Sequence, residues 1–425
     1  MPATKELVAT IIFAIAILHT FSVPVFARLA NKGGRHAGLW HLLSEVEAVF
    51  GVWACVLLAY MALFINVQDA VGYMDRRDFT EPAFVFVIMV VAASRPILEL
   101  VSLIVGALSR ALPLRKEYAM YFIIMSVVPL FGSLITEPAA MTLAALMIRN
   151  RYFLRSTHDR FKYLTIGVLF VNISIGGVLT AYAAPPVLMV ANTFGWDSSF
   201  MLLHFGWRAA LAVFINAGLL TYVCRDALVA PAADPNIDNS TPTRPPVPVQ
   251  VMAIHLLFLV AVVLSSHHPV IFLGLLMLFL GYTDAYKVHQ NPLMIREGLM
   301  VGFFLAGLVV LGGMQKWWLQ DLLGGLSPHV LFWGAAALTA ITDNAALTYL
   351  GSMVEGTNEL WRYMLVAGAV TGGGLTVIAN APNPAGFSIL KGSFPDGAIS
   401  PLKLLLSAAI PTLITALLFL MPIGF

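Results

Sequence analysis

Long apolar stretches, separated by short polar segments, recur along the whole chain of 425 residues. Each is long enough to cross a hydrocarbon core of about 30 Å as a helix. We interpret the following ten stretches as membrane spans: 7–26, 40–65, 82–109, 161–194, 200–224, 248–266, 268–283, 292–315, 361–390 and 402–422. The pattern predicts an all-α polytopic membrane protein of about ten transmembrane helices. The first stretch has a poorly charged start, so we favour a span over a signal peptide.

Two further apolar regions, 118–154 and 328–354, have a different pattern. Each contains two arms that are short for separate crossings, joined by a polar tip: TEP at 136–138 and TDN at 342–344. Polar backbone is tolerated at membrane depth only where buried protein or water satisfies it. We therefore expect two re-entrant helical hairpins whose tips lie inside the protein.

The two halves of the chain resemble each other. Three pairs of segments match in the same order, at offsets of 206, 196 and 198 residues: ITEPAAMTLAALMI (135–148) with ITDNAALTYLGSMV (341–354), GGVLTAYAAPP (176–186) with GGGLTVIANAP (372–382), and 97–99 with 295–297. Each half would contain five spans and one hairpin, and because five is odd the second half starts from the opposite side. We predict two inverted repeats, 1–225 and 250–425, joined by a Pro-rich linker at 226–249.

Composition and charge support this topology. Hydrophobic residues make up 59% of the chain and charged residues 11%, whereas a soluble protein carries about 25% charged residues. A net charge of +2 gives no indication of a nucleic-acid partner. With the predicted spans, 17 Lys and Arg fall on one side and five on the other. The basic side is cytoplasmic by the positive-inside rule, which predicts a bacterial-type inner membrane protein with both termini outside.

The strongest chemical signal is one acid at each hairpin tip, Glu137 and Asp343. A charge at the bilayer centre costs at least about 2.5–3.5 kcal/mol, so it needs a function or a partner. One interpretation is a shared cation site, in which the two acidic side chains and freed carbonyl groups replace water around a hard ion. The other is a helix N-cap, in which the acid satisfies free N–H groups. Different oxygens of one carboxylate can serve both roles.

The spans at 161–194 and 361–390 are both interrupted by prolines, which are Pro185, Pro186, Pro382 and Pro384. Proline lacks an N–H, so carbonyl groups of the preceding turn lose their partners and become suitable Na⁺ ligands. The alternative is a simple packing kink. Thr180, Thr376, Asn380 and Asn383 could add further oxygens at the two breaks.

Other charged residues at membrane depth are candidate proton carriers or charge partners. Arg95 and Glu99 are spaced i, i+4 on one helix and predict an ion pair that neutralises both. Glu45 and Glu47 cannot face the same way on a helix, so one is a possible proton carrier and the other a partner for a base. Glu297 follows an arginine at the start of a span, where an interfacial pair and a site role are both possible.

These features together resemble a known family. The motifs ITEPAAMT, ITDNAALT, ANAPNPAGFSIL and HLLSEVEAVFG are similar to those of the putative sodium/proton antiporter family, within the Ion Transporter superfamily, over nearly the whole chain. The resemblance implies a homodimer in which a scaffold holds a mobile transport domain. It also implies ion sites at the hairpin tips and broken helices. By motif position these sites are Thr136 and Glu137 with the break at Pro185, and Thr342, Asp343 and Asn344 with the break from Asn380 to Asn383. Both tips here are acidic, unlike the neutral tips of anion-carrying members.

The predicted function is exchange of Na⁺ for H⁺ by alternating access, with Na⁺ at the hairpin tips and no other cofactor. A carboxylate that holds either ion couples the two by competition. The alternative is a Na⁺- or H⁺-coupled symporter of a small anion or organic acid, because helix N-termini near the midplane attract anions. No GxSxG, HExxH or Walker motif is present, so we do not predict an enzyme.

Overall fold

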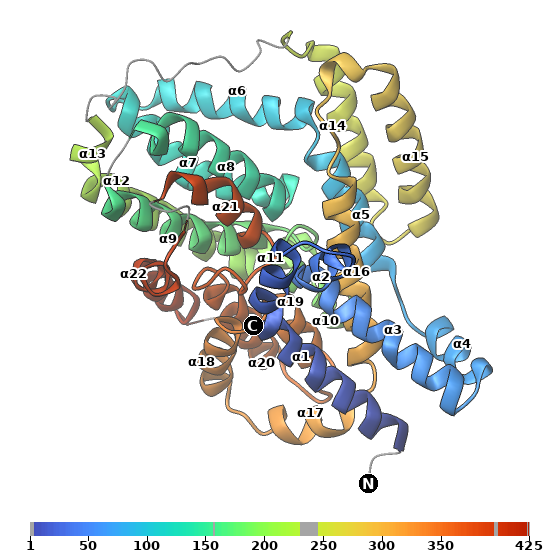
Figure 1. Cartoon of the computed structure of the whole chain (residues 1–425). Coiled ribbons are helices and arrows are strands. Elements are labelled where there is room, and N and C mark those ends of the chain that lie inside the picture. Colours follow the sequence, from blue (N-terminus) through green and yellow to red (C-terminus); the bar gives the residue numbers. More distant parts are fainter. Residues whose placement is uncertain (1–3, 156–157, 230–244, 395–397, 423, 425) are drawn as a thin grey trace.

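The computed structural model describes residues 4–155, 158–229, 245–394, 398–422 and 424. Within these residues the fold is built from helices and contains no strand (Figure 1). The helices of the first half are α1 Thr4–Asn31, α2 Ala37–Leu43, α3 Val46–Phe64, α4 Val67–Asp75, α5 Thr80–Ala92, α6 Arg95–Ala111, α7 Lys116–Ile135, α8 Glu137–Arg151, α9 Asp159–Gly176, α10 Pro185–Phe194, α11 Ser198–Met201, α12 Trp207–Val223 and α13 Arg225–Val229. Those of the second half are α14 Val249–Leu264, α15 Pro269–Ala285, α16 Ile295–Gly312, α17 Lys316–Leu323, α18 Pro328–Thr339, α19 Asn344–Gly351, α20 Glu359–Gly372, α21 Asn383–Leu390 and α22 Pro401–Phe419.

The described residues contain seven helices long and apolar enough to cross a membrane, or up to eight if the bent pair α5 and α6 is one span. This is a multi-pass membrane protein. The count of ten spans stays a prediction, because α14 and α15 are apolar but have only 16 and 17 residues. Most of the predicted linker at 226–249 lies outside the described residues.

Two predicted spans are not single straight helices. The span at 40–65 divides at Ser44 and Glu45 into α2 and α3. The span at 82–109 bends by 65° between α5 and α6. Pro96 explains this bend, since it has no N–H to donate to the carbonyl of Ala92 and its ring excludes a continuous helix.

In both predicted hairpin regions, two helices meet at the polar tip. α7 and α8 pack against each other and meet at Thr136, while α18 and α19 flank residues 340–343. The expectation of short arms is wrong for α7, whose 20 residues are long and apolar enough to cross a membrane. Pro129 does not end α7, because Nδ2 of Asn172 donates to the carbonyl of Met125, the one that Pro129 cannot serve. Re-entry into the membrane stays a prediction.

Both predicted interruptions are present. The chain leaves helical geometry between residues 180 and 184, which separates α9 from α10, and between 373 and 382, which separates α20 from α21. The second arm of each hairpin packs on the far piece of the other half's broken helix: α8 on α21, and α19 on α10. Gly176 and Gly372 permit close packing, because a Cβ would overlap the backbone of Pro129 and of Ala336 respectively.

The helices form two groups. α3, α5, α14, α15 and α16 pack on one another, with α1 against α3 and α16. α7 to α10 and α12 pack with α18 to α22 in a second group. Figure 1 shows α14 and α15 at one edge of the molecule and α12 and α22 toward the opposite edge. Each group contains helices from both halves of the sequence, so neither group is a sequence half.

The shortest apolar helix of the first group is α5, with 13 residues, nine of them buried. A cavity of about 370 Å³ lies at its start and reaches the first helix break at Ala181 and Tyr182. Glu81, Asp197 and His267 contribute its ionisable side chains. The first break is therefore close to a polar recess.

Candidate functional site

The first hairpin tip places a carboxyl group in the interior of the helix bundle. Glu137, the first residue of α8, has no exposed surface. Its Oε2 accepts a hydrogen bond of 2.8 Å from Nδ2 of Asn380, which lies in the break between α20 and α21. Gly177 packs directly against the Glu137 carboxyl group, since a Cβ at residue 177 would overlap it. The tip of one half therefore contacts the helix break of the other.

Several buried polar atoms at the tips and breaks have no hydrogen-bond partner within the described part of the chain. They are Oε1 of Glu137, Oγ1 of Thr136, Oδ1 of Asn380, Oδ1 of Asn383, and both amide atoms of Asn344. A buried polar group left unsatisfied costs about 1–3 kcal/mol. All but one of these atoms are oxygens, the ligand type that hard cations prefer. The set therefore suits a small cation or bound water.

The second tip is built differently. Oδ1 of Asp343 accepts hydrogen bonds from the backbone N–H groups of Ala345 and Ala346, at 2.8 and 3.2 Å. The N-cap interpretation thus applies to Asp343, whereas the Glu137 side chain caps no helix. Both cap bonds use Oδ1, so Oδ2 of Asp343 is not engaged by the cap.

Two cavities meet at Asp343. The smaller, of about 20 Å³, is lined by Asp343, Glu47 and Asn380 among others. A water molecule needs roughly 10–15 Å³ on this measure, so the cavity has room for one water or one small ion. Asn380 also binds Glu137, so one amide links the cavity to the buried acid.

The larger cavity, of about 240 Å³, is lined mainly by apolar side chains of α1, α16, α17, α18 and α19. Its polar end is formed by Thr342 and Asp343. The Thr342 hydroxyl donates to the carbonyl of Leu338, one turn earlier. Asp343 is therefore the ionisable group that this cavity reaches.

A family model described as "Putative Na+/H+ antiporter" matches residues 4–422. The chain belongs to this antiporter family. No curated protein matches the sequence. Membership agrees with the resemblance noted from the motifs and identifies a transporter of the cation/proton antiporter class. Among the described residues, no three His, Cys, Asp or Glu side chains are placed to hold a metal ion together. An ion bound here would need amide, hydroxyl or carbonyl ligands besides the acids.

The antiporter's neighbouring acids Glu45 and Glu47 have separate environments. Glu45 accepts a hydrogen bond of 2.9 Å from Arg296 and lies 3.5 Å from His41. Glu47 lines the small cavity with Asp343. Glu45 is thus a charge partner, and Glu47 is the acid that faces the site. Of the two possibilities left open for Glu297, the structure shows no pair with Arg296 among the described residues, because Arg296 reaches Glu45 and Glu297 is exposed.

Some of the carbonyl oxygens that the helix breaks leave without a helical partner already accept hydrogen bonds from side chains. Nδ2 of Asn383 donates to the carbonyls of Gly373 and Thr376, at 2.8 Å each. Thr180 donates its hydroxyl hydrogen to the carbonyl of Ser133, and Thr376 donates to that of Ala340. The two threonines thus brace the breaks against the hairpins in the same way.

Prolines begin the far piece of each broken helix. Pro185 and Pro186 are the first two residues of α10, while Pro382 precedes α21 and Pro384 is its second residue. At the first turn of a helix the missing N–H costs nothing. Their position explains why the helices resume there after the breaks.

Arg95 and Glu99 lie away from this site. Their predicted ion pair is confirmed, at 3.4 Å. Arg95 also donates to the carbonyl of Pro245 at 2.7 Å, and Glu99 accepts from the backbone N–H of Val247. The pair therefore anchors the described end of the linker region to the bend between α5 and α6.

Sequence reasoning missed Ser133. Its hydroxyl donates to the carbonyl of Gly176 and accepts from the backbone N–H of Leu179. With the bond from Thr180, this serine fixes the first break against α7. The available signal was its spacing, four residues before Glu137 and hence one helical turn from the tip.

Proposed function

We propose that this antiporter exchanges Na⁺ for H⁺ across the membrane by alternating access, with Glu137 and Asp343 as the central acids. The observation that carries the proposal is the fully buried Glu137 carboxyl group. It has one unpaired oxygen, one bond to an amide and, among the described residues, no ion pair with a base. Burial without a counter-charge favours the protonated acid, whereas a bound cation favours the ionised one. The two ions therefore compete for one group, which couples their movements.

The proposed ligand set consists of Glu137, Asp343, Asn380 and Glu47, with Thr136, Asn344 and Asn383 around them. Their orphaned oxygens and the cavity of about 20 Å³ support a dehydrated monovalent cation. In this scheme Glu47 or Asp343 accepts the proton from the cavity side, and Glu137 holds the deeper ion. Thr180 and Thr376 maintain the geometry of the breaks.

The architecture that we propose is two inverted repeats, 1–225 and 250–425, each with a re-entrant hairpin. The reciprocal packing of α8 on α21 and α19 on α10 supports this, as does the matched bracing by Thr180 and Thr376. We further propose a homodimer in a bacterial-type inner membrane, with both termini outside. The group of α1, α3, α5, α14, α15 and α16 would be the scaffold, and the group with the broken helices would move.

The test is ion flux in proteoliposomes that contain a pH-sensitive dye. With an inward Na⁺ gradient, protons should leave the vesicles, so the lumen becomes alkaline. Li⁺, K⁺ and candidate anions are added in turn, and protein-free vesicles provide the baseline. Saturable uptake of an organic acid or oxyanion, together with no Na⁺-driven proton movement, would instead establish the symporter alternative.

A further inference from the structure

A further sequence match connects the starts of the two broken helices. Residues 158–163 read HDRFKY and residues 358–363 read NELWRY, an offset of 200. An acid, a large aromatic residue, a base and a tyrosine therefore occupy matching positions at the start of α9 and of α20. The far ends also match, because Phe194 closes α10 and Phe394 follows α21 at the same offset. Each broken segment, 159–194 or 359–394, thus has a base as its fourth residue and ends with a phenylalanine.

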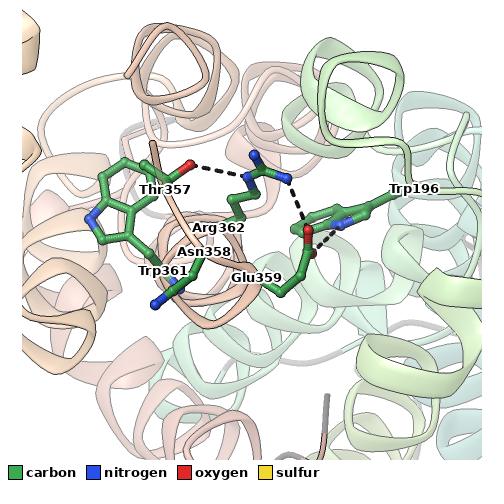
Figure 2. Close-up of polar contacts among 6 residues, drawn as sticks. All are labelled: Trp196, Thr357, Asn358, Glu359, Trp361 and Arg362. Carbon is green, nitrogen blue, oxygen red and sulfur yellow. Dashed lines mark hydrogen bonds and ion pairs between the residues drawn. The ribbon is translucent and has the colours of Figure 1, made fainter. Parts of the chain in front are cut away.

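The first contact joins the start of α20 to the end of α10. Figure 2 shows its polar part, in which the Glu359 carboxylate lies between Arg362 and Trp196. The Arg362 guanidinium lies 5.2 Å from the ring centre of Phe194, within the range of a cation–π contact. Arg362 also donates to Glu359 at 2.9 Å. Trp196 donates from its indole nitrogen to the other Glu359 oxygen at 3.0 Å. We call Phe194, Trp196, Glu359 and Arg362 the α10–α20 clamp.

The second contact joins the start of α9 to the residues that follow α21. Lys162, only 6% exposed, donates from Nζ to the carbonyl of Ser393 at 2.5 Å. The same Nζ lies 6.0 Å from the ring centre of Phe394. Tyr163 accepts a hydrogen bond of 2.9 Å from the backbone N–H of Ser400, just beyond. We call Lys162, Tyr163, Ser393 and Phe394 the α9–α21 clamp.

A further pair of bases continues the correspondence. Lys403 of α22 lies 5.3 Å from the ring centre of Tyr163, and Arg208 of α12 lies 6.0 Å from that of Tyr363. In both clusters a base on the broken helix contacts the other segment's phenylalanine. A base on the last helix of membrane-crossing length in a half, α12 or α22, contacts the tyrosine. Such matched chemistry 200 residues apart indicates a shared role for the two clusters.

The placement of the clamps indicates what that role is. The two broken segments run in opposite directions, with one clamp at each end and the two breaks between them. The Asn380 bond to Glu137 lies at those breaks. Both clamps are formed in one and the same structure, whereas a pair of alternating gates would have one end open. The clamps therefore fix the crossing of the two segments.

We propose that Lys162 and Arg362 are equivalent positioning residues, which pin the ends of the two broken helices and so hold Asn380 and Asn383 around Glu137. The effect on transport rests on the proposed Na⁺/H⁺ exchange. The clamping itself does not, and it can be measured separately. Because one clamp uses Lys and the other Arg at the matching position, either base should serve at either end.

The first experiment measures exchange in proteoliposomes with full-length protein. Lys162→Gln or Arg362→Gln should raise the half-saturating Na⁺ concentration about tenfold and change the maximal rate by less than about twofold. The double variant should show the product of the two effects, since the clamps share no residue. Lys162→Arg and Arg362→Lys should behave like the parent. Arg160→Gln, which removes an exposed base on the same helix as Lys162, is the matched control.

The second experiment measures amide hydrogen exchange in detergent without Na⁺. In each Gln variant the amide hydrogens of residues 177–184 and 373–382 should exchange faster than in the parent, whereas in Arg160→Gln they should not. If the parent moves no protons with Na⁺ but the breaks still exchange faster in the variants, the clamp stands and the proposed function fails. The clamp would be overturned if the Gln variants showed the parent's amide hydrogen exchange at both breaks, or if they lowered only the maximal rate of transport. It would also be overturned if Lys162→Arg and Arg362→Lys behaved like the Gln variants.

Discussion

The two hairpin tips share the sequence Ile-Thr-acid, yet the structure places their acids in different environments. At the first tip, Glu137 is the opening residue of α8, fully buried and bonded through one oxygen to Asn380. At the second, Asp343 precedes α19, caps it and lines two cavities. Matching positions in the two halves therefore need not have the same role. One acid is desolvated and the other remains accessible.

The largest effect on Na⁺-driven proton movement is expected from Glu137→Gln. The amide keeps the size of the side chain and an oxygen that accepts from Asn380, but it can neither ionise nor bind Na⁺ as a carboxylate. Na⁺-driven proton movement should fall to the level of empty vesicles while the thermal stability in detergent is retained. Glu117→Gln, at the exposed start of the same hairpin, is the control and should exchange normally. Normal exchange by the Glu137 variant would remove that acid from the mechanism.

The next effect separates the two roles of Asp343. Asn is as good an N-cap as Asp, so Asp343→Asn should change stability by less than about 0.5 kcal/mol while abolishing exchange. Asp343→Ala should lose exchange and also about 1 kcal/mol of stability, because α19 loses its cap. Ion flux and thermal unfolding, measured on the same preparations, separate the transport role of Asp343 from its capping role. An Asn variant that transports like the parent would show that Asp343 is only a cap.

The smallest effect concerns the backbone of the two tips. Thr136 has φ 73° and ψ 150°, a region that costs a residue with a side chain about 1–3 kcal/mol. Thr136→Gly should therefore stabilise the protein, by about 1 kcal/mol after the greater chain entropy of glycine is subtracted. Thr342 has no positive φ, so Thr342→Gly should be destabilising. Unfolding temperatures that shift in the same direction would contradict this contrast.

The sequence predicted the features that depend on local pattern. The two tips, the proline-flanked breaks and the acids at the tips follow from residue types and their repetition. The strained backbone at Thr136 does not, because the same Ile-Thr-acid motif has ordinary geometry at Thr342. Pro129 resembled Pro96 in the sequence, but only Pro96 bends its span, since Asn172 supplies the donor that Pro129 lacks.

The assignment of the remaining acids depended on distant contacts. Glu45 and Glu47 are two residues apart, and their roles were left open because either could meet a base. Arg296, 251 residues further along the chain, binds Glu45 and leaves Glu47 toward Asp343. No periodicity in the sequence encodes that choice. The same holds for Arg95, whose bond to the Pro245 carbonyl spans 150 residues.

The short helix α5 has an electrical consequence. Its 13 residues extend about 20 Å at 1.5 Å per residue, against a hydrocarbon thickness of about 30 Å. The recess at its start, of about 370 Å³, has room for water between Glu81 and the first break. Membrane voltage falls mainly across the dry part of a protein, so here it falls over a shorter distance. A charge that moves a given distance past the breaks therefore crosses a larger share of the membrane potential.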